Sequence, residues 1–94
     1  MADSIMQKEK VCFFTGSTYG LDKHHVIGGS RRSKSEKWGC WVWLRHDVHM
    51  DLHERDQGMS RILKATCQKR FEALYGHDKW MEEFGKSYLE EDEV

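Results

Sequence analysis

The chain contains no proline, and none of its apolar runs approaches the length of a membrane span. A helix needs about 20 consecutive apolar residues to cross a bilayer. The first ten residues are also too polar for a signal peptide. Turns must therefore rely on the eight glycines and on Asp and Ser. These absences predict a protein without a membrane partner.

Cysteine is scarce, and its number is odd. Cys12, Cys40 and Cys67 share no regular spacing. A disulfide framework normally shows an even number of cysteines at characteristic intervals, and disulfides persist in oxidising compartments. We therefore expect three free thiols and a cytoplasmic location, with Cys12 as a small buried apolar side chain.

The length of 94 residues predicts a single domain. A chain this short buries only about 60–65% of the surface that it exposes when unfolded. Such domains often gain stability from a metal or a partner. Its four Trp, four Phe and three Tyr are enough large side chains for a small core.

The net charge of −1 conceals two regions of opposite sign. Residues 23–70 carry eleven Lys and Arg against five Asp and Glu, whereas residues 71–94 carry two Lys against eight Asp and Glu. A basic centre indicates a polyanionic ligand. The acidic end is a solvated tail, a shield or a surface for a protein partner.

Four of the six histidines lie in two short stretches. His49 and His53 are four residues apart, so on a helix they lie one turn apart on the same face. Imidazole is the commonest metal-binding side chain, although the same spacing also occurs on helices that bind nothing. The adjacent pair His24 and His25 favours a metal site, because one of them can supply a third nitrogen. Neighbours in a strand point to opposite faces, and the spacing does not decide which of the two is the ligand.

Hydrophobic periodicity and turn residues predict an α+β fold. Residues 21–27 read as a strand that Gly28 and Gly29 end. A basic loop or short helix follows over residues 30–37, and residues 40–44 read as the second strand, so the two strands would form a hairpin with a long connection.

Helices account for the rest of the pattern. One is expected over residues 47–56, with Gly58 as its stop, and Val48 and Leu52 share its apolar face. A longer helix begins near Ser60 and ends before Gly76. A short helix follows, in which Asp78 is a suitable cap, and it carries Trp80, Met81 and Phe84 up to Gly85.

Two histidines followed by a Gly-Gly pair, a short aromatic strand and a helix with His49 and His53, in this order, resemble an HNH endonuclease. That family belongs to the ββα-metal, or His-Me finger, class, and the chain particularly resembles its small phage-encoded members. The resemblance implies one domain over residues 1–94. Its parts are a ββα-metal core over residues 11–56, C-terminal helices over residues 59–89 and a tail over residues 90–94.

The resemblance also implies a function and a role for each site residue. His24, His49 and His53 would hold one divalent metal ion (Mg²⁺, Mn²⁺, Ni²⁺ or Zn²⁺), and His25 would act as general base in the hydrolysis of DNA phosphodiester bonds. The protein would act as a phage protein in the cytoplasm of a bacterial host. Five basic residues would contact DNA phosphates: Arg31, Arg32, Lys34, Lys37 and Arg45.

Two departures from the family pattern concern the sequence around the core. Cys12 is followed by Thr15, and Arg45 and Val48 stand where the second half of a zinc knuckle would be, so we expect no structural zinc. Cys40 falls near the position of the family's Asn, which orients the base histidine. Either a backbone carbonyl, Asp22 or another group orients His25, or catalysis is weak.

Two alternatives to a nuclease stay open. In the first alternative, the chain is a catalytically weak or inactive protein of this fold that binds nucleic acid. In the second, it is a small phage protein that inhibits a host protein through its acidic C-terminal region. The four histidines argue against decay of the site.

Overall fold

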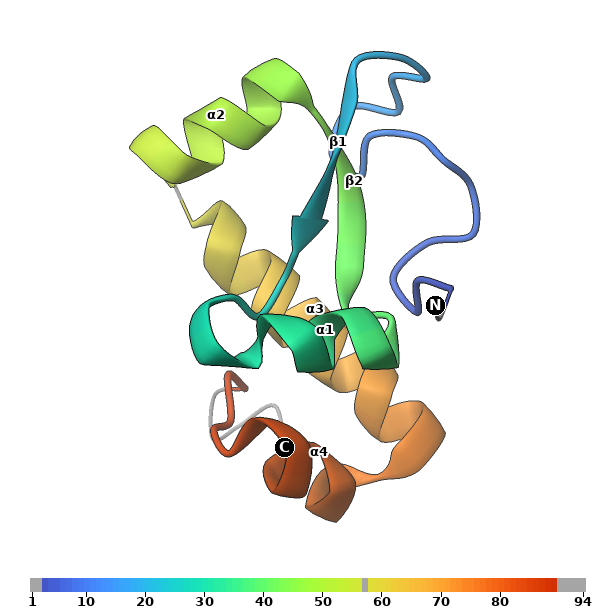
Figure 1. Cartoon of the computed structure of the whole chain (residues 1–94), viewed down its shortest axis with the longest axis vertical. Helices are drawn as coiled ribbons and strands as arrows, with labels where there is room; N and C mark the ends of the chain where they lie inside the picture. The colour runs from blue at the N-terminus through green and yellow to red at the C-terminus, as the bar shows by residue number, and fades with distance from the viewer. Residues whose placement is uncertain (1–2, 57, 90–94) are drawn as a thin grey trace.

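Two strands, one 3₁₀ turn and four helices follow one another in the computed structural model, which describes residues 3–56 and 58–89 (Figure 1). The predicted α+β class is confirmed. The elements are β1 (Leu21–His25), η1 (Gly29–Arg31), α1 (Arg32–Trp38), β2 (Trp41–Arg45), α2 (His46–Glu54), α3 (Met59–Tyr75) and α4 (His77–Phe84).

The two strands pair antiparallel, and their register assigns each histidine of β1 to one face. His24 lies opposite Val42, and His25 lies opposite Trp41. Val42 is fully buried, so His24 shares the face that covers the core, because paired residues of antiparallel strands point the same way. His25 points to the other face of the sheet. The two adjacent histidines therefore start from opposite sides of one strand.

β1 ends at His25, two residues earlier than expected, because the chain turns away into α1. The Val26 amide still donates to the Cys40 carbonyl (2.9 Å). The buried Ser35 side chain then holds Ile27 twice: its hydroxyl donates to the Ile27 carbonyl (2.6 Å) and accepts from the Ile27 amide (3.1 Å). These bonds fix α1 against the end of β1.

The connection from α1 to β2 depends on Gly39. This residue has φ of 76° and ends α1 in the left-handed region, which glycine adopts without a steric penalty. A Cβ at this position would also collide with the backbone carbonyl of Asp3. Both constraints favour glycine at the turn that brings β2 back beside β1.

α2 begins at His46 and ends at Glu54, so it is displaced slightly from the predicted range 47–56. Leu52 is buried and Val48 packs against the core, as their shared face predicts. Gly58 is the N-cap residue of α3, with φ of 80°, rather than the residue that ends α2. Figure 1 shows α2 lying next to β1, on the side away from the N-terminal segment.

α3 and α4 complete the core with aromatic side chains. Phe71, Trp80 and Phe84 are at most 1% exposed, and the rings of Trp80 and Phe84 stack with centroids 4.3 Å apart. The prediction of these two helices is confirmed. α4 begins at His77 after Gly76, and Asp78 lies in its first turn instead of capping it.

The segment before β1 runs along the outer edge of β2. The Phe13 amide donates to the Trp43 carbonyl (2.8 Å) and the Gln7 side chain accepts from the Trp43 amide (2.7 Å), so the edge of the sheet is covered. Met6 is 1% exposed, so the core includes residues before position 11. Cys12 is 1% exposed, as expected for a small apolar side chain. None of the helices in the described part of the chain has the length and apolar character that a membrane crossing requires.

Candidate functional site

Three imidazoles converge where β1 meets α2. His24 comes from β1, and His49 and His53 come from α2. One potential ligand atom from each lies within 4.8 Å of the other two. The Nε2 atoms of His49 and His53 are 3.1 Å apart. Two nitrogens that each lie about 2.1 Å from one metal ion stand about 3.0–3.4 Å apart at octahedral or tetrahedral angles, so this separation fits a shared ion.

The local sequence explains why these side chains meet. α2 follows β2 with no intervening loop and packs on β1. Its apolar residue Leu52 turns inward, which leaves His49 and His53 on the adjoining stripe, one turn apart. That stripe covers the end of β1 where His24 points toward the core.

Asp22 sets the orientation of His49. Its Oδ2 atom lies 3.0 Å from Nδ1 of His49 and 2.7 Å from Nδ1 of His46. A carboxylate only accepts hydrogen bonds, so each of these Nδ1 atoms carries a proton. The lone pair of neutral His49 is then on Nε2, which is the atom directed at His53.

The same contacts lower the pKa of the Asp22 carboxyl, first through the hydrogen bond from His49 and then through that from His46. Asp22 was one of the groups expected to orient His25. In the structure, its carboxylate contacts His46 and His49. His46 is an exposed partner of this carboxylate and lies outside the converging group.

His24 is kept neutral by its surroundings. Burial is the main cause that lowers the pKa of His24, to about 4, and the neighbouring His49 and His53 add to the effect. Metal ligands must be deprotonated. A neutral His24 at physiological pH is therefore ready to donate its lone pair without competition from a proton.

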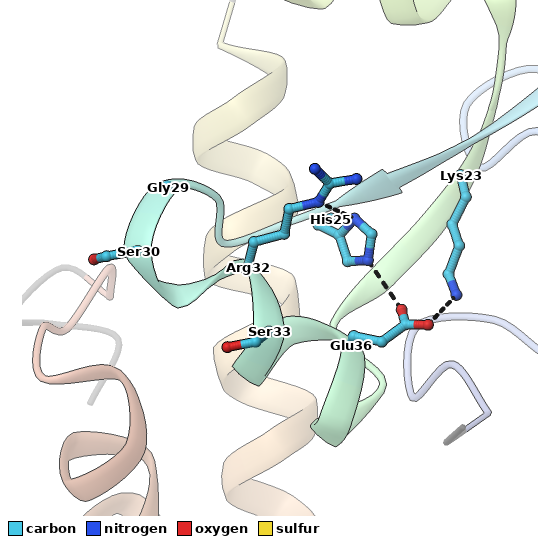
Figure 2. A pocket seen from close by; sticks show the side chains of 7 residues that line it. All are labelled: Lys23, His25, Gly29, Ser30, Arg32, Ser33 and Glu36. Carbon is cyan, nitrogen blue, oxygen red and sulfur yellow. Dashed lines mark hydrogen bonds and ion pairs between the residues drawn. The ribbon is translucent and has the colours of Figure 1, made fainter.

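His25 contacts α1 on the other side of β1. Its Nε2 atom lies 2.9 Å from the carboxylate of Glu36, and its Nδ1 atom accepts a hydrogen bond from Nε of Arg32 at 3.3 Å (Figure 2). His25 and Arg32 also line a hollow together with His24, His49 and His53. The two adjacent histidines therefore border one depression, although they start on opposite faces of β1.

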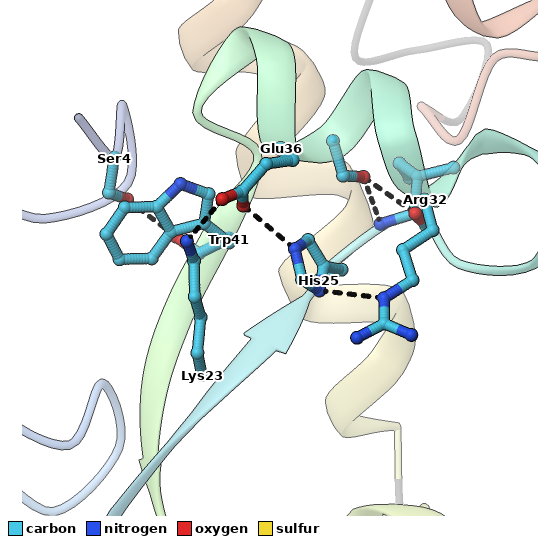
Figure 3. A network of polar contacts seen from close by, with 8 residues as sticks. Ser4, Lys23, His25, Arg32, Glu36 and Trp41 are labelled. Carbon is cyan, nitrogen blue, oxygen red and sulfur yellow. Dashed lines mark hydrogen bonds and ion pairs between the residues drawn. The ribbon is translucent and has the colours of Figure 1, made fainter. Parts of the chain in front are cut away.

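Glu36 belongs to a polar network that reaches β2. Lys23 donates to the second carboxylate oxygen of Glu36 (2.8 Å) and lies 4.2 Å from the ring centre of Trp41 (Figure 3). The hydrogen bond from Lys23, followed by that from His25, lowers the pKa of the Glu36 carboxyl. Cys40 is fully buried, and its amide donates to the Ser35 carbonyl.

The basic residues expected to contact phosphates occupy four different places. Only Arg32 among them lines the hollow with the histidines. Arg31 and Lys34 donate to the carbonyl of Glu83 near the end of α4, at 3.2 and 2.8 Å. Of the remaining two, Arg45 forms an exposed ion pair with Asp47 and Lys37 lies over the ring of Trp38.

Two carboxylates of the site, those of Asp22 and Glu36, make contacts that the sequence alone does not predict. Asp22 stands two residues before His24 in β1, so the strand period of two places both on one face. Glu36 stands four residues after Arg32 in α1, and the helical period places these two side chains next to each other. From these periods, Asp22 could have been placed beside His24 and Glu36 beside Arg32. The periods could not show which histidine each carboxylate contacts, because those histidines belong to other elements.

Within residues 3–56 and 58–89, His24, His49 and His53 form the one group of three or more His, Cys, Asp or Glu side chains placed to share a metal ion. Cys12 does not belong to that group. Comparisons with protein-family models, curated proteins and solved structures found no match for the chain. The function is therefore argued from the geometry of this site.

Proposed function

We propose that the protein is a metal-dependent endonuclease that hydrolyses DNA phosphodiester bonds with a ββα-metal core. The observation that carries the proposal is the convergence of His24, His49 and His53 beside His25 in one hollow. The order of strand, strand and helix around this hollow supports the resemblance to the HNH family. The proposal assigns the ligand role to His24, because it is His24 that faces α2.

The donor set fits one divalent metal ion. Three neutral imidazoles make a site of borderline character that favours Zn²⁺ or Ni²⁺ over Mg²⁺, and three protein ligands leave positions for water and substrate. A metal ion held there supplies a positive charge that stabilises the phosphate and the leaving oxygen as negative charge develops.

His25 acts as the base. It takes a proton from a water molecule as the water oxygen bonds to phosphorus and the bond from phosphorus to the leaving oxygen breaks. The leaving oxygen then takes a proton from solvent. A positioned general base typically contributes 10²- to 10⁴-fold to such a step. His25 is suited to it because it borders the hollow and does not belong to the converging group.

Arg32 is the basic residue best placed to hold the scissile phosphate, because it lines the same hollow as the histidines. Arg31, Lys34, Lys37 and Arg45 extend the positive charge over the surrounding surface. Contacts of this kind give affinity without sequence information. We therefore propose DNA as the substrate, cleaved with little sequence preference.

A plasmid-nicking assay with Mg²⁺, Mn²⁺, Ni²⁺ and Zn²⁺ tests the proposal. The wild type should convert supercoiled plasmid to open circles. His25→Ala should lose 10²- to 10⁴-fold in rate and still bind metal. His77→Ala is the matched control, since His77 pairs with Glu72 away from the hollow. Absence of cleavage with every metal would refute the nuclease function.

Retained binding of DNA without cleavage would support the alternative, a nucleic-acid-binding protein of this fold. Inhibition of a host protein through residues 71–94 stays a prediction, and part of that region, residues 90–94, lies outside the described residues. Action in the cytoplasm of a phage-infected bacterium also stays a prediction.

A further inference from the structure

We propose that Glu36 is the positioning residue of His25: it fixes the imidazole ring and its tautomer so that Nδ1 is the working nitrogen. The kinetic consequence rests on the proposed nuclease function, but the structural assignment does not. The motif residues alone leave the orienting group of His25 open, and the structure brings Glu36 to it from α1.

The two contacts of His25 admit one neutral tautomer. A guanidinium has donors and no acceptor, so the hydrogen bond from Nε of Arg32 requires a lone pair on Nδ1 of His25. The proton of the neutral ring is then on Nε2. The carboxylate of Glu36, 2.9 Å away, is an acceptor for that proton. Glu36 and Arg32 therefore favour the same tautomer from opposite sides of the ring.

Glu36 is held more firmly than a surface glutamate. Its second oxygen is bonded to Lys23 at 2.8 Å, and the ammonium of Lys23 lies over the Trp41 ring, which is only 8% exposed. Its neighbour in α1, Ser35, is buried and holds both backbone polar groups of Ile27. Glu36 thus contacts Lys23 and His25 of β1, and Lys23 in turn lies over Trp41 of β2. Figure 3 shows the Glu36 carboxylate between Lys23 and His25.

The hydrogen bond from Arg32 to Nδ1, on the opposite side of the His25 ring, is easier to break than the contact with Glu36. The side chain of His25 is 14% exposed, whereas Arg32 is exposed and its bond to Nδ1 is the longer one at 3.3 Å. A phosphate in the hollow would attract the guanidinium of Arg32 and uncover the lone pair of Nδ1. The Glu36 contact persists during this exchange and keeps the proton on Nε2. A water molecule can then donate to Nδ1.

Two substitutions at position 36 and one matched control test the assignment. Glu36→Ala removes the acceptor, and Glu36→Gln keeps the size of the side chain and one acceptor oxygen. Glu72→Ala is the control, because Glu72 makes the same type of contact with His77 at 2.7 Å. Circular dichroism and thermal unfolding establish that each variant is folded.

The first measurement is the ¹⁵N NMR spectrum of the His25 ring at a pH where it is neutral. The wild type should show one tautomer, with a protonated Nε2 and an unprotonated Nδ1. Glu36→Ala should move both nitrogen shifts toward a mixture, and Glu72→Ala should leave them in place. If the His25 shifts are the same in the wild type and in both position-36 variants, Glu36 does not position the ring.

The second measurement is steady-state cleavage of an oligonucleotide duplex. Glu36→Ala should lower kcat by about 10- to 100-fold, by analogy with the loss caused by removing the outer-shell partner of a metal-binding histidine, with KM and metal affinity unchanged. Glu36→Gln should lose less than Glu36→Ala. An equal loss of kcat in Glu72→Ala would overturn the kinetic role. If the wild type cleaves nothing while its tautomer depends on Glu36, the nuclease function fails and the positioning assignment stands.

Discussion

The carboxylate of Asp22 on β1 lies 3.0 Å from Nδ1 of His49 on α2. This bond joins the strand to the helix and leaves Nε2 of neutral His49 as the nitrogen with a lone pair. Because Asp22 and His24 share one face of β1, the same strand supplies one ligand and orients another. The candidate metal centre therefore depends on how α2 docks on β1.

We expect one divalent ion per chain, bound by the three converging imidazoles. Isothermal titration calorimetry with Zn²⁺ or Ni²⁺ should give a stoichiometry near one. Removal of any ligand by His24→Ala, His49→Ala or His53→Ala should weaken binding by more than about 100-fold, beyond the usual outer-shell effect. His77→Ala should bind as the wild type does. Unchanged affinity in the His49→Ala and His53→Ala variants would show that the ligands are elsewhere.

Asp22→Asn should weaken metal binding by about 10- to 100-fold without removing a ligand, because His49 loses the carboxylate that orients it. Asp47→Asn is a suitable comparison, since the Asp47 carboxylate pairs with Arg45 at the start of α2. Competition with a metal-sensitive dye measures both affinities. An effect of equal size in the two variants would point to a general loss of charge near α2 rather than to the contact with His49.

We expect the chain to stay folded in chelator, because the fold has a formed aromatic and aliphatic core and Cys12 lies outside the converging group. Loss of the ion should lower the free energy of unfolding only by the binding contribution, about 2.7 kcal/mol at a free metal concentration of 100 Kd. The melting temperature should fall accordingly. Thermal unfolding followed by circular dichroism checks this. Unfolding in chelator, together with stoichiometric zinc that Cys12→Ser abolishes, would reveal a structural zinc.

Arg32→Ala should weaken DNA binding and reduce the slope of log K against log salt by about 0.9, the contribution of one phosphate contact to duplex DNA. Arg45→Ala should change the slope less, because the guanidinium of Arg45 is paired with Asp47. Fluorescence anisotropy on a His25→Ala background gives both slopes without cleavage. Equal slopes for the Arg32→Ala variant and its parent would show that Arg32 does not contact a DNA phosphate.

The pKa of His24, lowered to about 4 mainly by burial, predicts a pH dependence of stability in the metal-free protein. The unfolded chain has an ordinary histidine pKa near 6.5, so between about pH 6.5 and 4 it binds more protons than the folded chain. The free energy of unfolding that depends on neutral, buried His24 is thus fully present above about pH 6.5 and is lost as the pH falls toward 4.

Urea unfolding between pH 7 and 4 should show this loss in the wild type and a shallower decline in His24→Gln. The difference in slope should not exceed about 1.4 kcal/mol per pH unit, the value for one proton. Parallel declines in the two proteins would mean that His24 binds protons equally in the folded and unfolded states.

The sequence by itself determined the α+β class, the positions of α3 and α4 and the i, i+4 pair on α2, because these follow from local periodicity and from the types of residue at turns. It left residues 30–37 open as a loop or a short helix, and the structure forms α1 there. It also indicated that one of His24 and His25 could join that pair. The ends of β1 and α2 were less certain from local pattern, since Ser35 and Gly58 act there through tertiary contacts and turn geometry.

Only the tertiary structure decided which histidine faces which partner. Strand period places His24 and His25 on opposite faces, but the docking of α2 on one face and of α1 on the other assigns His24 to the imidazole cluster and His25 to Glu36. Those contacts join residues that are 11 to 29 positions apart in the chain. Local propensity carries no information about such pairs, because their proximity results from the packing of the helices against the sheet.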